Sequence, residues 1–113
     1  MKADLEVIGN VTVVRARGKI TIGEGEVKLR ETIEELLAKG TKNILLDLGN
    51  VSFMDSSGVG ELVGCLTTVM HRGGKLKLLN LTKKIHDLLQ VTQLITIFEC
   101  HADEAGALRS YNS

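Results

Sequence analysis

The sequence contains no proline and no tryptophan, and only one tyrosine and two phenylalanines among its 113 residues. It also lacks low-complexity segments and internal repeats. Basic and acidic side chains cancel, 14 against 14, so no excess of positive charge indicates binding to nucleic acid or to an anionic membrane surface. No segment approaches the roughly 18 consecutive apolar residues that a membrane-spanning helix needs. We therefore expect neither nucleic acid nor a membrane as a partner.

Cysteine is also scarce, because Cys65 and Cys100 are the only two. Neither belongs to a spacing that indicates a disulfide framework. Residues 1–6 lack the apolar core of a secretory signal peptide. The length suits one domain, and a hydrophobic content of 43% is sufficient for a packed core. We therefore expect a single cytoplasmic domain over residues 1–113.

The spacing of apolar residues divides the chain into short strands and amphipathic helices. Strands are predicted over residues 5–8, 11–17, 43–48, 75–79 and 95–98. Helices are predicted over residues 26–39, 59–70, 83–90 and 102–111. Residues 19–25 are predicted to form a loop, because the glycines at 23 and 25 discourage a regular element.

This order of elements predicts an α/β fold with a mixed sheet of about five strands and about four helices packed on it. The first two strands, joined at Gly9 and Asn10, are expected to be antiparallel neighbours. Right-handed crossovers would make the later strands parallel. Binding sites in such sheets favour the carboxyl ends of the strands. Asp55 and Ser56 follow the third strand and lie at such an end.

Two helices carry clear apolar stripes, and their ends carry recognisable cap signals. The first stripe consists of Leu29, Ile33, Leu36 and Leu37, and the second of Val59, Leu62, Val63, Leu66, Val69 and Met70. Gly40 is well placed to end the first helix. Asn80 or Thr82 could cap the helix that begins near residue 83.

Asp55, Ser56, Ser57 and Gly58 mark the transition from the third strand to the second helix. Serine and aspartate are preferred as helix caps, and from spacing alone a serine cap is the favoured interpretation. The alternative is a hydroxyl exposed for modification or contact. A phosphate there would lie at a helix N-terminus, where unpaired N–H groups and the dipole tolerate negative charge.

Other functional motifs fail on their spacing. The glycines from Gly58 to Gly64 resemble a dinucleotide fingerprint, but the third is displaced by one position. His71, His86 and His101 are too dispersed to indicate a metal site. The nucleophile elbow of serine hydrolases is absent, so an enzyme is the least supported interpretation. We expect no catalytic residue, no metal and no cofactor.

The segment from Val51 to Gly60 resembles the signature of the STAS family, the bacterial anti-sigma factor antagonists. The resemblance covers nearly the whole chain and includes three further segments, at residues 18–20, 73–78 and 86–94. It implies the STAS fold. Two positions depart from the family pattern: Thr21 stands where many members carry an acid, and Gln93 stands where glycine is frequent at a helix end.

The resemblance also implies a mechanism, in which Ser56 is phosphorylated by an anti-sigma factor that is also a serine kinase. The unphosphorylated protein binds that kinase and frees a sigma factor, and a serine phosphatase resets the phosphorylated form. The protein would be a monomer or a weak dimer. The implied partner-binding residues are Asp55, Ser56, Ser57, Gly58, Val59, Gly60, Thr21 and Glu24.

Two other functions remain open at this stage. The first is a STAS subunit of a larger assembly, either a stress-signalling scaffold or a transporter accessory complex. The second is a nucleotide-binding module, because a turn followed by a helix N-terminus is a fair anion site.

Overall fold

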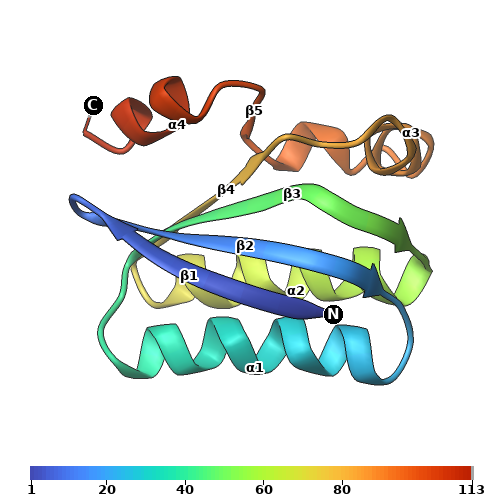
Figure 1. The fold of residues 1–113 in the computed structure, drawn as a ribbon, viewed down its shortest axis with the longest axis horizontal. Coiled ribbons are helices and arrows are strands. Elements are labelled where there is room, and N and C mark those ends of the chain that lie inside the picture. The colour runs from blue at the N-terminus through green and yellow to red at the C-terminus, as the bar shows by residue number, and fades with distance from the viewer. Residues whose placement is uncertain (113) are drawn as a thin grey trace.

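A computed structural model describes residues 1–112, in which helices pack on a five-stranded sheet (Figure 1). The strands are β1 Lys2–Ile8, β2 Val11–Ile20, β3 Asn43–Met54, β4 Lys75–Leu79 and β5 Cys100–His101. The helices are α1 Glu24–Ala38, α2 Ser56–His71, α3 Lys83–Val91 and α4 Glu104–Ser110, with a short 3₁₀ helix at Ile95–Ile97. Five strands and four α-helices within residues 1–112 confirm the predicted α/β class.

The strands lie in the sheet in their sequence order, from β1 at one edge to β5 at the other. β1 and β2 form an antiparallel hairpin that closes at the Ile8–Val11 pair. Gly9 in this turn has a φ of 61°, a left-handed conformation that glycine adopts without steric cost. β2, β3, β4 and β5 are parallel, as predicted from the crossover connections.

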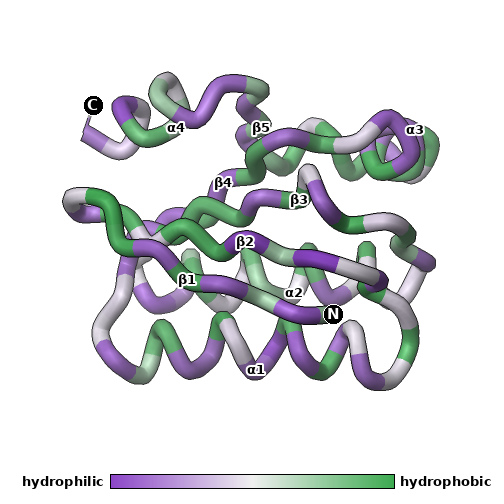
Figure 2. Tube along the Cα trace, in the orientation of Figure 1, coloured by the Kyte–Doolittle hydropathy of each residue, from purple (hydrophilic) through white to green (hydrophobic). Residues whose placement is uncertain are grey.

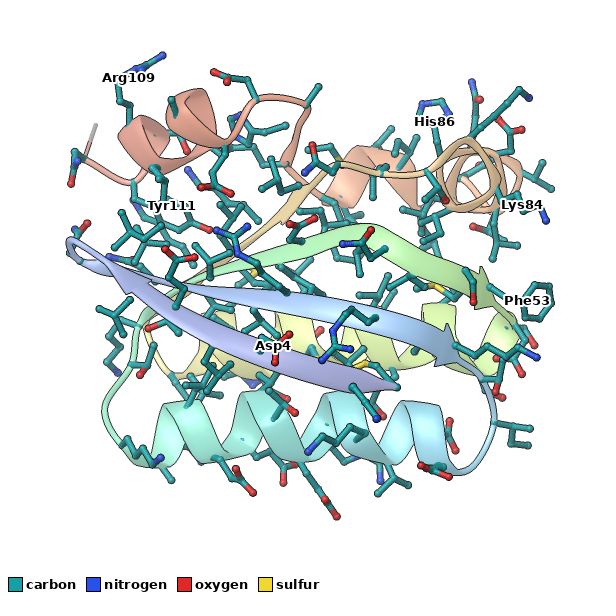
Figure 3. The ribbon with its side chains drawn as sticks, viewed as in Figure 1. Asp4, Phe53, Lys84, His86, Arg109 and Tyr111 are labelled. Carbon is teal, nitrogen blue, oxygen red and sulfur yellow. The ribbon has the colours of Figure 1, made fainter. Side chains whose placement is uncertain are left out.

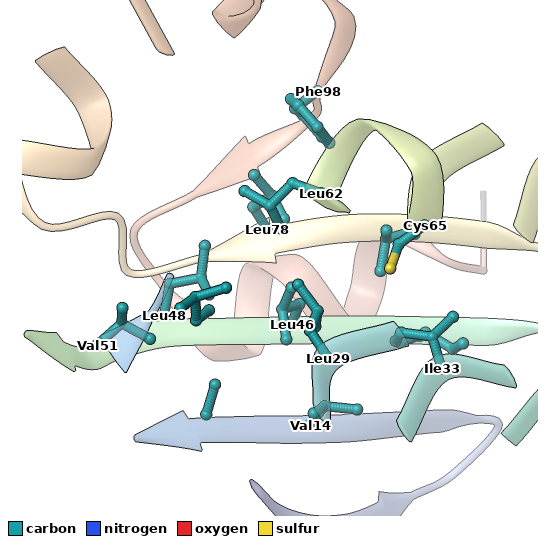
Figure 4. Close-up of a cluster of buried hydrophobic side chains, with 14 of the residues drawn as sticks. Val14, Leu29, Ile33, Leu46, Leu48, Val51, Leu62, Cys65, Leu78 and Phe98 are labelled. Atoms are coloured by element: carbon teal, nitrogen blue, oxygen red, sulfur yellow. The ribbon is translucent and has the colours of Figure 1, made fainter. Parts of the chain in front are cut away.

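The larger part of the core lies where α1 and α2 pack on one face of the sheet (Figures 1 and 4). The predicted stripe of α1 is buried, with Leu29 and Ile33 at most 1% exposed. From α2, Leu62 and Val69 are fully buried and meet Leu46 of β3 in the same cluster. Polar and apolar residues alternate along both helices (Figure 2), so each helix buries one stripe and exposes the other.

A smaller apolar cluster lies on the side of the sheet that carries α4. Ala107 and Tyr111 pack there against residues of the sheet, and the Tyr111 hydroxyl donates to the carbonyl oxygen of Ile44. Arg15 of β2 holds the start of α4 through Glu104, at 2.7 Å. Polar contacts therefore supplement a small apolar contact area in fixing the C-terminal helix.

The strands beside the candidate site are longer than predicted. β3 continues to Met54 instead of ending at residue 48, and β2 continues to Ile20. Two register shifts in the β2–β3 ladder allow this extension through a segment rich in turn-forming residues. The predicted loop over 19–25 is correspondingly short, because α1 already begins at Glu24.

The strand predicted over residues 95–98 is wrong, since Ile95–Ile97 is a 3₁₀ helix and the fifth strand is Cys100–His101. The reason is the end of α3. Gln93 has a φ of 61°, and the next residue, Leu94, donates its N–H to the Leu89 carbonyl at 2.8 Å. This closing motif keeps the chain beside the helix and overrides the β-propensity of the residues that follow.

The predicted buried and capping residues of the helices are partly confirmed. Met70 was predicted inside but is 61% exposed, and Cys65 at 2% exposure is buried in the α2 stripe instead. Thr82 is the cap of α3. Gly40 has the expected left-handed conformation, with a φ of 90°. None of the helices in the described residues has the length and apolar character needed to cross a membrane.

Candidate functional site

The candidate site lies where β3 ends and α2 begins, and Asp55 is the residue between them. Met54 is buried, and Asp55 is the N-cap of α2 in an extended conformation. Its Oδ1 accepts the N–H of Gly58 at 2.9 Å. The serine cap favoured from spacing is therefore wrong. Ser56 and Ser57 are the first two residues of the helix itself.

Asp55 also joins this turn to the loop that follows β2. Its second oxygen, Oδ2, accepts the backbone N–H of Ile22 at 2.9 Å. The hydrogen bonds from Ile22 and then from Gly58 lower the pKa of the Asp55 carboxyl. The carboxylate thus fixes the predicted contact residues Thr21 and Glu24 beside the start of α2, and it places a negative charge next to Ser56.

Close backbone contacts hold both helix starts against the end of β2. A Cβ atom on Gly58 would lie 2.2 Å from the carbonyl oxygen of Ile20 and 2.7 Å from Cγ of Met54. A Cβ atom on Gly25 would lie 2.6 Å from the carbonyl oxygen of Lys19. Glycine is required at both positions because no side chain fits between the backbones.

The remaining predicted site residues divide by exposure. Ser56, Gly60 and Glu24 are exposed, and Ser57 is half-buried. Val59 is 4% exposed and belongs to the core, so its side chain supports the surface from below. Among the described residues the Ser56 hydroxyl has no hydrogen-bond partner, because Asp55 performs the capping. The fold therefore does not use this hydroxyl.

Exposed apolar side chains flank the turn, and the sequence reasoning missed them. Ile22 is 73% exposed, Phe53 is 49% exposed and Val91 of α3 is 81% exposed. Phe53 projects from the end of β3 beneath α3, which carries Lys84 (Figure 3). The sequence offered little signal for Phe53, because burial does not alternate along the end of β3: Val51 and Met54 are buried, whereas Ser52 and Phe53 are exposed.

The site can present a serine hydroxyl to another molecule. In residues 1–112 no three His, Cys, Asp or Glu side chains gather closely enough to hold a metal ion. Cys65 is inaccessible, and burial together with the nearby Glu61 raises the pKa of its thiol. The site offers an exposed serine at a helix N-terminus, where the first N–H groups have no partner within the helix.

Comparisons with known proteins agree with this architecture. The sequence matches the family model of the STAS domain over residues 2–107. It is 32% identical over 109 residues to the anti-sigma-B factor antagonist of Bacillus subtilis strain 168, which covers 96% of this chain and 98% of that protein. It is 26% identical over 108 residues to the anti-sigma F factor antagonist of Paenibacillus polymyxa, with coverage of 96% and 92%.

Solved structures show the same fold. The phosphorylated form of the Bacillus cell fate determinant SpoIIAA superimposes with a TM-score of 0.75 at 25% identity, over 97% of this chain and 99% of that one. A protein from Thermotoga maritima superimposes with a TM-score of 0.90 at 22% identity, over 98% of this chain and 95% of that one. The family model and the Bacillus subtilis relative both span almost the entire chain. The protein therefore belongs to the STAS domain family.

Proposed function

We propose that this protein is an anti-sigma factor antagonist that is switched off by phosphorylation at Ser56. Unphosphorylated, it binds an anti-sigma factor that is also a serine kinase, and the sigma factor is released. The observation that carries the proposal is the exposed Ser56 at the start of α2, whose hydroxyl the fold leaves unused. The names of the Bacillus and Paenibacillus relatives support the role. The likeness to SpoIIAA in its phosphorylated form supports the modification.

The chemistry requires only an acceptor from this chain. The Ser56 oxygen attacks the γ-phosphorus of ATP held by the kinase, the new O–P bond forms, and the bond to the β-phosphate oxygen breaks to release ADP. The hydroxyl proton passes to a base of the kinase. A serine phosphatase then hydrolyses the phosphoserine and restores the binding form.

The fold can carry this phosphate. A phosphoserine adds about −1.5 to −2 charges at pH 7. At position 56 these charges lie at the N-terminus of a 16-residue helix, where the dipole and the unpaired N–H groups favour an anion. The modification therefore changes what docks on the surface while α2 stays in place.

A phosphate on Ser56 changes the affinity for the kinase far more than it changes the stability of the fold. The phosphate lies beside the Asp55 carboxylate, which its two backbone hydrogen bonds keep ionised. Burying this paired negative charge in an interface without new cationic partners costs several kcal/mol. A cost of about 3–5 kcal/mol weakens binding by roughly 10²- to 10³-fold or more. One phosphate is therefore enough to release the kinase.

The protein acts in the cytoplasm as a monomer or weak dimer, and its partners are the kinase and the phosphatase. Its partner surface includes Thr21 and Glu24 beside the start of α2, which the Asp55–Ile22 hydrogen bond holds in place. This chain itself catalyses no step.

The direct test is phosphorylation by a serine kinase of the anti-sigma factor class from the same organism, with ATP and mass-spectrometric mapping of the product. Wild type should gain one phosphate and Ser56→Ala none. Ser57→Ala is the control for the acceptor position and should still gain one phosphate, at Ser56. Failure to phosphorylate wild type, or phosphate on the Ser56→Ala variant, would overturn the assignment.

A second test separates docking from folding. Ser56→Asp should be as stable as wild type, or more stable by up to about 1 kcal/mol, because an acidic side chain is favourable in the first turn of a helix. Its affinity for the kinase should nevertheless fall, as measured by titration calorimetry. A large drop in melting temperature would count against a mechanism confined to docking.

A further inference from the structure

An apolar groove adjoins the candidate site on the side of α3. It has a volume of about 490 Å³. Phe53 and Met54 at the end of β3 form one side, and Ile85, Leu88 and Val91 of α3 form the other. Met54 and Ile85 are buried, whereas Phe53 and Val91 expose 49% and 81% of their surface. The groove therefore has a closed floor and open apolar walls.

The groove lies within reach of any protein that docks over Ser56. Phe53 precedes Ser56 by three residues, so their Cα atoms lie at most about 11 Å apart. A standard protein interface covers about 800 Å² on each partner, which is a disc of roughly 16 Å radius. An interface of this area centred on Ser56 extends beyond Phe53, which forms one wall of the groove.

The lining specifies what the groove accepts. Among the described residues, two charged side chains contribute to it, those of Lys84 and Asp87, and Asp87 is paired with Lys83 at 2.9 Å. Exposed aromatic and aliphatic walls over a buried floor are typical of pockets that receive an anchoring apolar side chain. Desolvating the walls costs no buried charge, since the charged groups stand at the rim.

We propose that this groove receives an apolar anchor side chain of the anti-sigma factor kinase that modifies Ser56. This inference rests on the proposed function and adds a second part to the binding surface. The groove supplies affinity, whereas the start of α2 supplies the phosphate acceptor and the switch. Damage to the groove should therefore raise the KM of the kinase for this protein and leave kcat nearly unchanged.

The decisive variant is Val91→Lys, which places a charge on the groove wall. Val91 ends α3, where a cation suits the helix dipole, so the fold should tolerate the change. Val7→Lys is the matched control, because Val7 is 73% exposed on β1, a strand that contributes no residue to the groove. Phe53→Ala and its control Ile97→Ala form a second pair, with original side chains 49% and 46% exposed.

The expected result is at least a ten-fold loss of kinase affinity for Val91→Lys and Phe53→Ala, with both controls within two-fold of wild type. At saturating protein, Ser56 should still be phosphorylated at the wild-type rate in all four variants. Methyl signals of Leu88 and Val91 should shift when the unlabelled kinase is added to the labelled protein.

Two outcomes would overturn the inference while the proposed function stands. In the first, wild type is phosphorylated at Ser56 and both groove variants bind the kinase like wild type. In the second, sedimentation shows a wild-type dimer that Val91→Lys dissociates without loss of kinase affinity, which would assign the groove to a second copy. If wild type neither binds the kinase nor accepts phosphate, the proposed function fails and the groove loses this occupant too.

Discussion

Replacing Gly58 by alanine drives a methyl group into the backbone at the end of β2. The added Cβ would stand 2.2 Å from the Ile20 carbonyl oxygen, where ordinary contacts begin at 3.4 Å. The start of α2 must therefore retreat by roughly 1 Å from a close-packed neighbour. Overpacking of this kind costs about 1–3 kcal/mol. The displacement also strains the bond between Asp55 and Ile22, which offsets the gain of up to about 1 kcal/mol from the better helix former.

The expected net effect of Gly58→Ala is a loss of about 1–3 kcal/mol in the free energy of unfolding, measured by urea denaturation with circular dichroism. An unfolding entropy of about 2.1 cal/mol/K per residue converts this into a fall of roughly 4–12 °C in melting temperature. Gly60→Ala is the matched control, because nothing lies within 4 Å of its added Cβ. The control should gain up to about 1 kcal/mol. If Gly58→Ala proves as stable as Gly60→Ala, the close-approach reasoning is wrong.

Three further changes test other contacts by the same denaturation assay. Asp55→Asn keeps an acceptor for the helix cap but loses the second carboxylate oxygen, so stability should fall and the amide of Ile22 should exchange faster; unchanged exchange would contradict this. Glu99 has its pKa lowered to about 2, chiefly by its hydrogen bond with His101. The contribution of its carboxylate to stability should be present above about pH 4.5 and fade as the pH falls through 2. It should not exceed roughly 1 kcal/mol, because the side chain is exposed. If the stability lost in Glu99→Gln, relative to wild type, became larger in acid, the predicted direction of the pH dependence would be wrong. Gln93→Gly should gain up to about 1 kcal/mol, because the left-handed conformation disfavours a residue with a Cβ; a lower urea midpoint would contradict it.

The parts of the fold predicted correctly from sequence are those where periodicity and burial agree. Leu29 and Ile33 recur at helical spacing and are buried, and the apolar run at residues 44–46 forms a strand covered on both faces. The misassigned segment at residues 95–98 has strong β-propensity, but the closing turn of α3 at Gln93 decides its path. A local pattern cannot reveal a constraint that a preceding helix end imposes.

The turn that the sequence singled out lies at the end of β3, but its helix cap is Asp55 and not the serine that spacing favoured. Serine and aspartate are both good caps, so spacing alone could not assign the role that the structure gives to Asp55. The bond from Ile22 joins residues 33 positions apart in the chain, which no local pattern encodes. The groove was invisible for the same reason, since Phe53 and Val91 come together only through the placement of α3.

The proposed phosphorylation switch would place two demands on one surface. The fold must remain stable when Ser56 carries a phosphate, and the interface with the kinase must weaken. Asp55 meets the first demand, because it caps α2 and holds the Ile22 loop without using the Ser56 hydroxyl. It would also serve the second, because its ionised carboxylate would stand beside a phosphate on Ser56 and add to the charge that a docked partner has to desolvate. The groove is apolar and lies to one side of that charge, so in the proposed complex the phosphate would lower affinity through the contacts over Ser56 and not through the anchor in the groove. Under this proposal the phosphate would act mainly by raising the rate of dissociation of the kinase, since most differences in affinity at one interface appear in that rate.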